Sequence, residues 1–101
     1  MPASDSQPRT YTIYMLRCGD GSLYTGITNS LTNRLASHMR GTGARYTRSR
    51  LPVTLCWSKS RQQPTAARKL EYAIKQLTRA QKERLVQGDR ALWRRLRNRI
   101  L

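Results

Sequence analysis

Acidic residues are scarce in this sequence. Its 101 residues include 5 Asp and Glu against 20 Lys and Arg, which gives a formal net charge of +15 at pH 7. A surplus of this size is not explained by charges scattered over a balanced surface, and it indicates a polyanionic partner. We expect that partner to be nucleic acid, with DNA favoured over RNA.

Long apolar runs are absent as well. No segment approaches the roughly 18 consecutive apolar residues of a membrane span. Residues 1–8 have neither the basic nor the apolar region of a secretory signal. We therefore expect a cytoplasmic protein without a membrane partner. No extra apolar stripe is left for self-association, so a monomer is favoured.

Ligands for soft metals are few. His38 is the single histidine, and Cys18 and Cys56 lie too far apart in sequence to form a Cys-x-x-Cys pair. These counts argue strongly against a zinc site. In a cytoplasmic protein the two cysteines are expected to be reduced thiols.

The pattern of apolar residues and turn residues predicts one small domain. Residues 1–9 are polar, carry two prolines and are expected to form a flexible leader, whereas residues 10–101 are expected to form a single domain. Residues 10–18 and 22–29 are rich in Tyr, Thr, Ile and Leu and predict two strands. Gly19-Asp20-Gly21 between them predicts the turn of a hairpin.

The length of that turn decides which side chains share a face. With an odd loop, such as three residues with Gly21 left-handed, even-numbered positions pair with even-numbered ones. Tyr14, Leu16 and Tyr24 then lie on one face of the hairpin. A two-residue loop would place the two tyrosines on opposite faces and abolish any shared site.

The next segment predicts a helix from a Ser30 cap to about Arg40. Its buried stripe should consist of apolar residues that recur every four positions, Leu31, Leu35 and Met39. Arg34 and His38 lie one turn apart at the edge of that stripe. From such an edge polar side chains can reach into a cleft.

The rest of the chain predicts one more strand and three more helices. Arg40 to Pro52 contains four arginines and no acidic residue, and predicts a basic loop. A strand with one buried face follows, in which apolar and polar residues alternate over Val53, Leu55 and Trp57. Helices are then predicted from Pro64, from a capping box at Thr78 and from a cap at Asp89, in that order. The predicted order of elements is β-β-α-β-α-α-α.

Glu71 stands alone in an otherwise basic middle part of the chain. One interpretation is a solvated glutamate that pairs with Arg68, Lys69 or Lys75 on its own helix. The other is a ligand for Mg²⁺ or Mn²⁺, because such a hard cation takes one or two carboxylates and completes its shell with water and substrate phosphate. In so basic a chain, bound phosphate and bound metal should strengthen each other.

Hydrolysis of a phosphodiester requires a base for the water and positive charge for the phosphate. The guanidinium of Arg34 suits phosphate oxygens, and His38 could orient a group or accept a proton. Both are equally compatible with an ordinary helix surface. Tyr14 and Tyr24 are compatible with packed strand residues. A tyrosine acts as a base only where neighbouring cations lower its pKa from about 10.

These residues together resemble the GIY-YIG nuclease family in order and spacing. The resemblance rests on Thr12-Ile13-Tyr14, Tyr24-Thr25-Gly26, Arg34, His38 and Glu71, and it extends over residues 11–77. The stretches from Asp20 to Gly26 and from Arg45 to Thr47 are similar to the small single-domain bacterial members in particular.

The resemblance implies an α+β fold, in which helices flank a three-stranded antiparallel sheet, and a metal-dependent endonuclease. It also implies one divalent metal held by Glu71, with Tyr24 as general base. Tyr14 would position water or substrate, Arg34 would stabilise the phosphate, and His38 occupies a place where members carry His or Tyr.

The basic segments are expected to contact the nucleic acid backbone without reading its sequence, because no second domain is predicted that would read bases. The expected contacts are Arg40, Arg45, Tyr46, Arg48, Arg50 and Arg68.

The chain departs from the family pattern in four places. Thr12 and Thr25 stand where the name-giving motifs have glycine and isoleucine, and neither position supplies a reactive group. Ile27 stands where many members carry lysine, and Asn98 is the only candidate for an asparagine that some members use after the glutamate. The alternative function is therefore a non-catalytic, basic nucleic-acid-binding module of the same fold. Either function leaves room for a separate targeting protein as partner.

Overall fold

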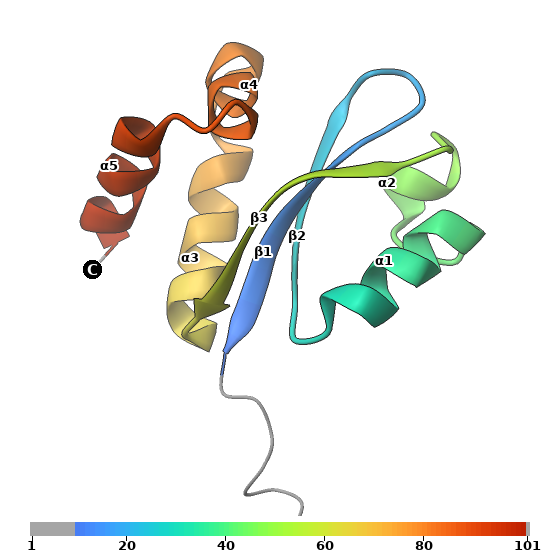
Figure 1. The fold of residues 1–101 in the computed structure, drawn as a ribbon, viewed down its shortest axis with the longest axis horizontal. Helices are drawn as coiled ribbons and strands as arrows, with labels where there is room; N and C mark the ends of the chain where they lie inside the picture. The colour runs from blue at the N-terminus through green and yellow to red at the C-terminus, as the bar shows by residue number, and fades with distance from the viewer. Residues whose placement is uncertain (1–9, 101) are drawn as a thin grey trace, which may run out of the picture.

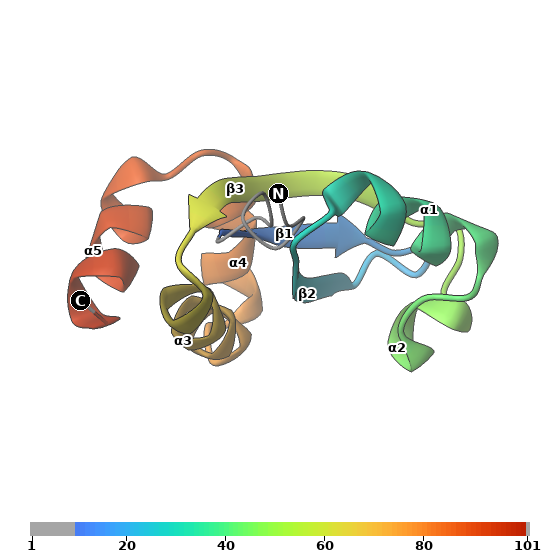
Figure 2. The same ribbon diagram turned by 90° about the horizontal axis from the view of Figure 1, so that it is seen from below.

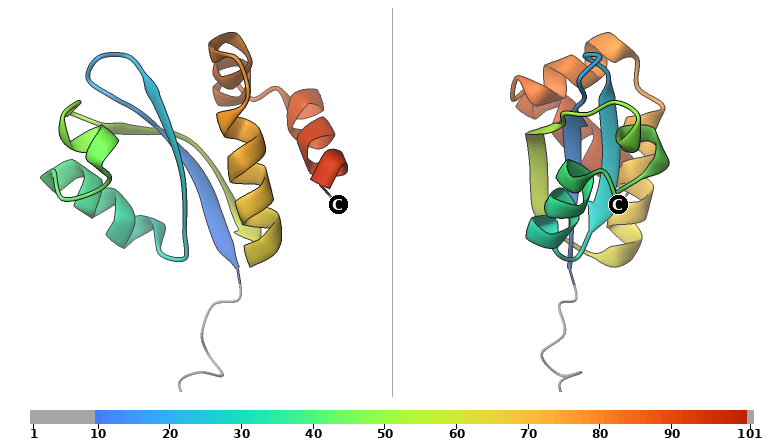
Figure 3. Two further views of the ribbon diagram at one scale, coloured as in Figure 1. Left: turned by 180° about the vertical axis from the view of Figure 1, so that it is seen from behind. Right: turned by 90° about the vertical axis from the view of Figure 1, so that its right-hand side faces the viewer.

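The structure is a computed structural model that describes residues 10–100, so the predicted leader lies outside the described residues. Its elements are β1 (Tyr11–Arg17), β2 (Leu23–Thr28), α1 (Leu31–Arg40), α2 (Arg45–Arg48), β3 (Thr54–Gln62), α3 (Pro64–Lys75), α4 (Arg79–Val86) and α5 (Arg90–Ile100). The three strands form an antiparallel sheet in the order β2-β1-β3. Helices α1 and α2 lie on one side of this sheet, and α3, α4 and α5 lie on the other (Figure 1, Figure 2 and Figure 3). The predicted fold class and order are confirmed, with the short helix α2 added.

The hairpin has the odd turn on which a shared site depends. Leu16 pairs with Tyr24 and Tyr14 with Gly26, so even positions face even positions. The N–H of Gly21 donates to the carbonyl of Cys18 at 2.9 Å, and Gly21 has a φ of 85°. That left-handed conformation favours glycine. Tyr14, Leu16 and Tyr24 therefore share one face, as predicted.

Alternation along β1 divides the core into two clusters. The odd positions Ile13 and Met15 pack against the side of α3, α4 and α5, in a cluster with Trp57, Ala67, Leu70, Ile74, Leu85, Leu92 and Leu96. The even positions Tyr14 and Leu16 face α1, in a smaller cluster with Cys18 and Val53. Full burial of one large apolar side chain contributes about 1.5–3 kcal/mol. The larger cluster therefore carries most of the stability, and the smaller one can accommodate polar groups.

Strand β3 departs from the predicted pattern through a β-bulge. Met15 pairs with Trp57 while the next residue, Leu16, pairs with Leu55, so β3 holds one extra residue at this point. The bulge places Trp57 in the cluster of α3 and leaves Val53 and Leu55 on the side of α1. The prediction of one buried face for these three residues was wrong, because simple alternation does not reveal an extra residue in one strand.

Helix α1 begins where predicted but is anchored differently. The Ser30 side chain makes no capping hydrogen bond, and the Ser30 N–H donates instead to Oγ1 of Thr28 at 3.0 Å. Met39, predicted to be buried, is 55% exposed, whereas His38 is fully buried. The histidine takes the interior place because its ring nitrogens find hydrogen-bond partners there, which removes the cost of burying them.

Part of the predicted basic loop is helical. In α2 the backbone N–H groups of Thr47 and Arg48 donate to the carbonyl of Ala44 at 3.1 and 3.0 Å. The Thr47 hydroxyl donates to the same carbonyl at 2.9 Å, and Thr47 is fully buried. The prediction of a loop missed this turn, which carries a buried hydroxyl toward α1.

The two C-terminal helices are capped as predicted. The Thr78 hydroxyl accepts a hydrogen bond from the N–H of Gln81 at 3.1 Å within a capping box. Asp89 Oδ1 accepts one from the N–H of Leu92 at 2.9 Å. No helix among residues 10–100 is long and apolar enough to cross a membrane.

Candidate active site

A row of buried hydrogen bonds joins β1, α1 and α2. The Tyr14 hydroxyl lies 2.9 Å from Nε2 of His38. Nδ1 of the same ring lies 2.8 Å from Oγ1 of Thr47, which in turn bonds to the carbonyl of Ala44. Tyr14, His38 and Thr47 are at most 1% exposed. His38 is therefore an interior residue and not an ordinary residue of the helix surface.

The donor and the acceptor can be assigned for each hydrogen bond in this row. Because the Thr47 hydroxyl donates its only proton to Ala44, its oxygen accepts from the Nδ1–H of His38. Burial first, and the charge of Arg34 second, lower the pKa of His38, so the ring is neutral at neutral pH. Nε2 is then an acceptor, and the Tyr14 hydroxyl donates to it. The Tyr14 oxygen keeps its lone pairs for a donor on the other side.

Arg34 provides positive charge on that other side. The pKa of Arg34 is raised mainly because its guanidinium approaches the Tyr14 hydroxyl as a hydrogen-bond donor. The Tyr24 hydroxyl raises this pKa further. Burial raises the pKa of Tyr14, and Arg34 opposes this effect without reversing it. Tyr14 therefore keeps its proton at neutral pH.

Tyr24 lies at the solvent side of the same group. Its ring centroid is 6.4 Å from that of Tyr14 and 5.3 Å from that of His38, and it stacks on Tyr46 of α2 at 6.1 Å with an interplanar angle of 26°. The guanidinium of Arg50 covers the Tyr46 ring at 3.8 Å. The predicted residues Tyr46 and Arg50 thus extend the site outward as a stacked aromatic and cationic layer.

Two glycines make room for the buried row. A Cβ at Gly26 would lie 2.6 Å from the Tyr14 hydroxyl oxygen, and one at Gly43 would lie 2.5 Å from Nδ1 of His38. Neither contact is sterically possible for a real side chain. The glycine of the Tyr24-Thr25-Gly26 motif is thus required by the Tyr14 side chain across the hairpin, which lies directly over it.

Glu71 approaches the site from the other side of the sheet. Its side chain is 23% exposed on α3, and one of its carboxylate oxygens lies 3.3 Å from Nζ of Lys75. Burial is the main cause that raises the pKa of Tyr14, and the negative charge of Glu71 makes a minor contribution in the same direction. Lys75 also lines a hollow at the β2 edge of the sheet together with Tyr24, Thr25 and Tyr46. Residues from helices on both sides of the sheet therefore line this hollow, Tyr46 from α2 and Lys75 from α3.

The side chains at this edge fit a hydrated hard cation. The described residues contain no group of three or more His, Cys, Asp or Glu that could hold a metal ion by themselves. Glu71 keeps one carboxylate oxygen outside its ion pair with Lys75. Thr25 is one of the residues that line the hollow, and its Oγ1 is the only buried side-chain polar atom of residues 10–100 without a hydrogen-bond partner. One carboxylate and room for water suit Mg²⁺ or Mn²⁺, which accept water and phosphate as further ligands.

The remaining predicted contacts divide into two groups. Arg40 at the end of α1 and Arg45 and Arg48 on α2 are exposed on the side of the sheet that carries the tyrosine group. Arg68 lies elsewhere, with its guanidinium 5.9 Å from the ring centroid of Tyr11 at the start of β1. The structure therefore does not bring Arg68 into the site.

Comparison with known proteins identifies the family. Residues 10–84 match the GIY-YIG catalytic domain. The chain belongs to the GIY-YIG family. The match indicates a nuclease and confirms the resemblance drawn from the two tyrosine motifs.

Similar proteins cover most of this GIY-YIG chain. A UPF0213 protein of Bacillus velezensis is 44% identical over 84 residues, which are 83% of this chain and 85% of the relative. Two solution NMR structures are also similar. That of a UPF0213 protein of Bacillus halodurans has a TM-score of 0.52 and 40% identity, over 77% of this chain and 83% of the other. That of a protein of E. faecalis has a TM-score of 0.58 and 37% identity, over 84% and 91%.

Two side chains of the GIY-YIG site escaped prediction. Thr47 orients His38 from a segment that was predicted as a loop, and the only sequence signal was its place after Arg45-Tyr46. Lys75 lines the hollow beside Tyr24, whereas Ile27, at the position where many members carry lysine, packs against the core. Asn98 lies on α5, on the far side of the sheet from α1 and α2, and is not part of the tyrosine group.

Proposed function

We propose that this protein is an endonuclease that depends on a divalent metal and hydrolyses phosphodiester bonds of nucleic acid, with DNA favoured over RNA and little sequence preference. The observation that carries the proposal is the convergence of Tyr14, Tyr24, Arg34 and His38 on one face of the hairpin. The carboxylate of Glu71 acts on the same group. If the two tyrosines were only packed strand residues, there would be no need for a buried histidine held by hydrogen bonds to Tyr14 and Thr47.

The two tyrosines have different parts in this proposal. The Tyr14 hydroxyl donates a hydrogen bond to Nε2 of His38 and has a raised pKa, so it positions water or substrate as a neutral group. Tyr24 lines the hollow, where an incoming water would meet its hydroxyl. We assign Tyr24 as the general base, because the family resemblance gives it this role and it is the tyrosine that lines the hollow.

Arg34 and the exposed basic segment bind the substrate. The Arg34 guanidinium lies beside both hydroxyls, where a phosphate held between them would accept its hydrogen bonds. Arg40, Arg45 and Arg48 are exposed nearby and would contact neighbouring phosphates. Such contacts position the backbone and carry little sequence information.

Glu71 is the residue that would hold Mg²⁺ or Mn²⁺. When bound, the metal supplies positive charge for the phosphate and for the departing oxygen. A single carboxylate beside Lys75 should bind a cation weakly. Metal affinity is therefore expected to rise when nucleic acid is present, since phosphate adds both ligands and negative charge.

A substrate panel tests the proposal. Purified protein is incubated with labelled single-stranded, duplex and branched DNA and with RNA, with Mg²⁺, with Mn²⁺ and with a chelator. We expect cleavage that the chelator stops. Tyr24→Phe should abolish cleavage and leave binding nearly unchanged. Tyr72→Phe is the matched control, because Tyr72 is 69% exposed and lies on α3 outside the tyrosine group.

The panel also distinguishes the alternative function. A non-catalytic module would bind these substrates with the same steep dependence on salt, because both functions use the same basic surface. Binding without turnover on every substrate and with either metal would establish the binding module in place of the nuclease.

A further inference from the structure

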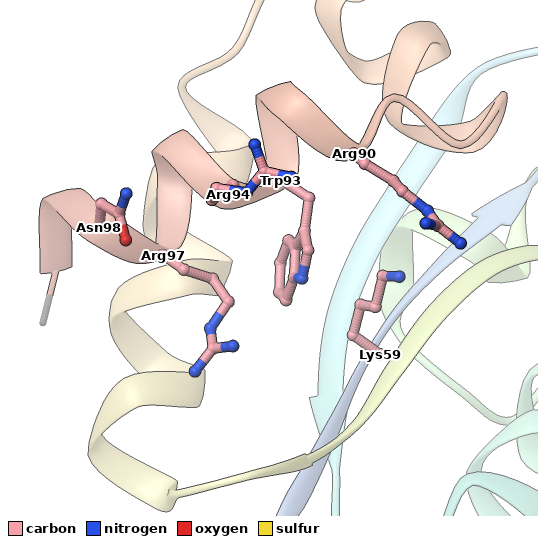
Figure 4. Close-up of a pocket in the computed structure, with 6 residues that line it drawn as sticks. All are labelled: Lys59, Arg90, Trp93, Arg94, Arg97 and Asn98. Carbon is pink, nitrogen blue, oxygen red and sulfur yellow. The ribbon is translucent and has the colours of Figure 1, made fainter.

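A second basic hollow lies between α5 and β3. It is lined by Lys59, Arg90, Trp93, Arg94, Arg97 and Asn98. Arg90, Arg94 and Arg97 recur at positions i, i+4 and i+7 and so lie on one face of α5. Figure 4 shows Trp93 and Arg97 reaching from α5 into the hollow, with Arg90 extending over its other end toward Lys59 of β3. Two elements far apart in sequence thus contribute cations to one place.

The cations of this hollow are not neutralised within the described part of the chain. The four acidic residues among residues 10–100 form their ion pairs with other cations, as Asp20–Arg50, Glu71–Lys75, Glu83–Arg17, Glu83–Arg79 and Asp89–Arg84. Four uncompensated positive groups around one hollow repel each other, and a bound polyanion would reverse that cost. The arrangement therefore favours an anionic ligand with several charges.

Trp93 gives the hollow an aromatic floor. Its ring packs edge to face on Trp57, with centroids 5.5 Å apart, and the Lys59 amino group lies 5.6 Å from its centroid. The ring is only partly buried, so one part of it remains accessible. An accessible aromatic ring surrounded by cations is the combination that contacts sugars and bases while the cations hold phosphates.

An anionic membrane is the other polyanion to consider, and the apolar residues of α5 argue against it. A helix that binds a membrane surface needs exposed apolar side chains on the face that enters the lipid. In α5 the apolar residues Leu92 and Leu96 are 3% and 1% exposed, because they pack in the main core. Apart from the partly buried Trp93 and Ile100, the helix therefore offers charge and no apolar face that could enter the lipid.

The hollow is separate from the tyrosine site. Helix α5 lies at one end of the longest axis of the molecule and α1 and α2 at the other, along an extent of 46 Å (Figure 1). The two sites also adjoin opposite edges of the sheet, because β2 lines one and β3 lines the other. The hollow is therefore a surface distinct from the tyrosine site, with its own lining residues.

We propose that the hollow between α5 and β3 is a second nucleic-acid-binding surface, which holds the phosphate backbone of a segment other than the one at the tyrosine site. It supplies binding and has no part in the chemical step. Phosphate contacts of this kind weaken as the salt concentration rises, so the salt dependence of nucleic acid binding tests the proposal directly.

The test compares two triple variants of the full chain. Arg90→Gln, Arg94→Gln and Arg97→Gln together remove three cations that line the hollow. Lys69→Gln, Arg95→Gln and Arg99→Gln remove three exposed cations that do not line it. Binding of a fluorescent 30-base-pair duplex is followed by anisotropy between 50 and 300 mM NaCl in the presence of EDTA, and circular dichroism checks that both variants are folded.

The hollow variant should bind the duplex at least about tenfold more weakly at 100 mM salt. Its slope of log affinity against log salt should be smaller by about 2–3, because each lost phosphate contact lowers the slope by about 0.9. The control variant should change the slope by less than about 1. Equal affinities and equal slopes for the two variants would overturn the proposal.

Two further arms separate the alternatives. Vesicles that contain phosphatidylserine should not distinguish the hollow variant from the control. A hollow variant that loses vesicle binding but keeps duplex binding would assign the hollow to membranes and overturn the proposal. Because EDTA prevents metal-dependent turnover, a failure of the nuclease assay would contradict the proposed function and leave this inference standing.

Discussion

Thr47→Val removes a single hydroxyl behind the tyrosine site. Valine has nearly the shape of threonine, and Thr47 is fully buried, so the packing around α2 should be kept. What is lost is the acceptor for the Nδ1–H of His38 and the donor to the carbonyl of Ala44. The substitution therefore tests the orienting role of Thr47 with little other disturbance.

The expected cost follows from the buried donor that is left without a partner. Leaving such a group unsatisfied costs about 1–3 kcal/mol. In a domain of this size, a loss of about 1 kcal/mol lowers Tm by about 4–8 °C. The ring can avoid part of the cost by moving its proton to Nε2, but it then donates toward Tyr14 and turns that hydroxyl around. We therefore expect a Tm at least about 4 °C lower and cleavage at least about tenfold slower, equivalent to about 1.4 kcal/mol.

Three measurements read out these changes. Thermal denaturation gives Tm, single-turnover cleavage gives the rate, and nitrogen-15 NMR gives the tautomer. The NMR signal is unambiguous because His38 is the only histidine in the chain. Thr47→Ser keeps the hydroxyl and should retain the Nδ1–H tautomer and most of the rate. A Val variant with the wild-type tautomer, Tm and rate would refute the orienting role.

Three further predictions concern stability and pH. Gly26→Ala should lower both Tm and cleavage, because its methyl group would overlap the Tyr14 hydroxyl; an Ala variant with wild-type Tm would contradict that contact. The folded state depresses the pKa of His38, so the unfolded state binds more protons and the free energy of unfolding should fall as the pH drops below about 6.5. In His38→Asn this part of the pH dependence should vanish from urea titrations. Arg17, first through its hydrogen bonds, lowers the pKa of Glu83 to about 2, so the stability from this pair should be lost as the pH falls from 4.5 toward 2. Glu83→Gln should remove that loss, and an unchanged acid titration would show that the pair contributes nothing.

The hairpin could be predicted from sequence because its decisive features are local. Gly21 supplies the left-handed turn, and the turn fixes the parity that places Tyr14 and Tyr24 on one face. The caps at Thr78 and Asp89 are local in the same sense, since each side chain accepts a hydrogen bond from a backbone N–H three residues further along its own helix.

The failures arose where contacts distant in sequence decide the outcome. His38 is buried instead of Met39 because Tyr14 and Thr47, on other elements, satisfy its ring. The bulge in β3 depends on pairing with β1 and leaves no local pattern. Arg68 lies on α3 near Tyr11, outside the tyrosine group, and its predicted contact with substrate stays a prediction. Such placements depend on the tertiary arrangement, which periodicity does not reveal.

The central claim is that Glu71 supports metal-dependent cleavage at the tyrosine site. It is tested most directly by single-turnover cleavage of labelled DNA across a Mg²⁺ titration, with wild type, Glu71→Gln and Glu83→Gln compared and DNA binding measured in parallel. Glu83 is the matched control, because it is also a partly exposed glutamate with cationic partners but belongs to the contact between α4 and the hairpin. We predict that Glu71→Gln loses cleavage at every metal concentration while it still binds DNA, and that Glu83→Gln cleaves. Cleavage by Glu71→Gln at the wild-type rate and with the wild-type metal dependence would contradict the account.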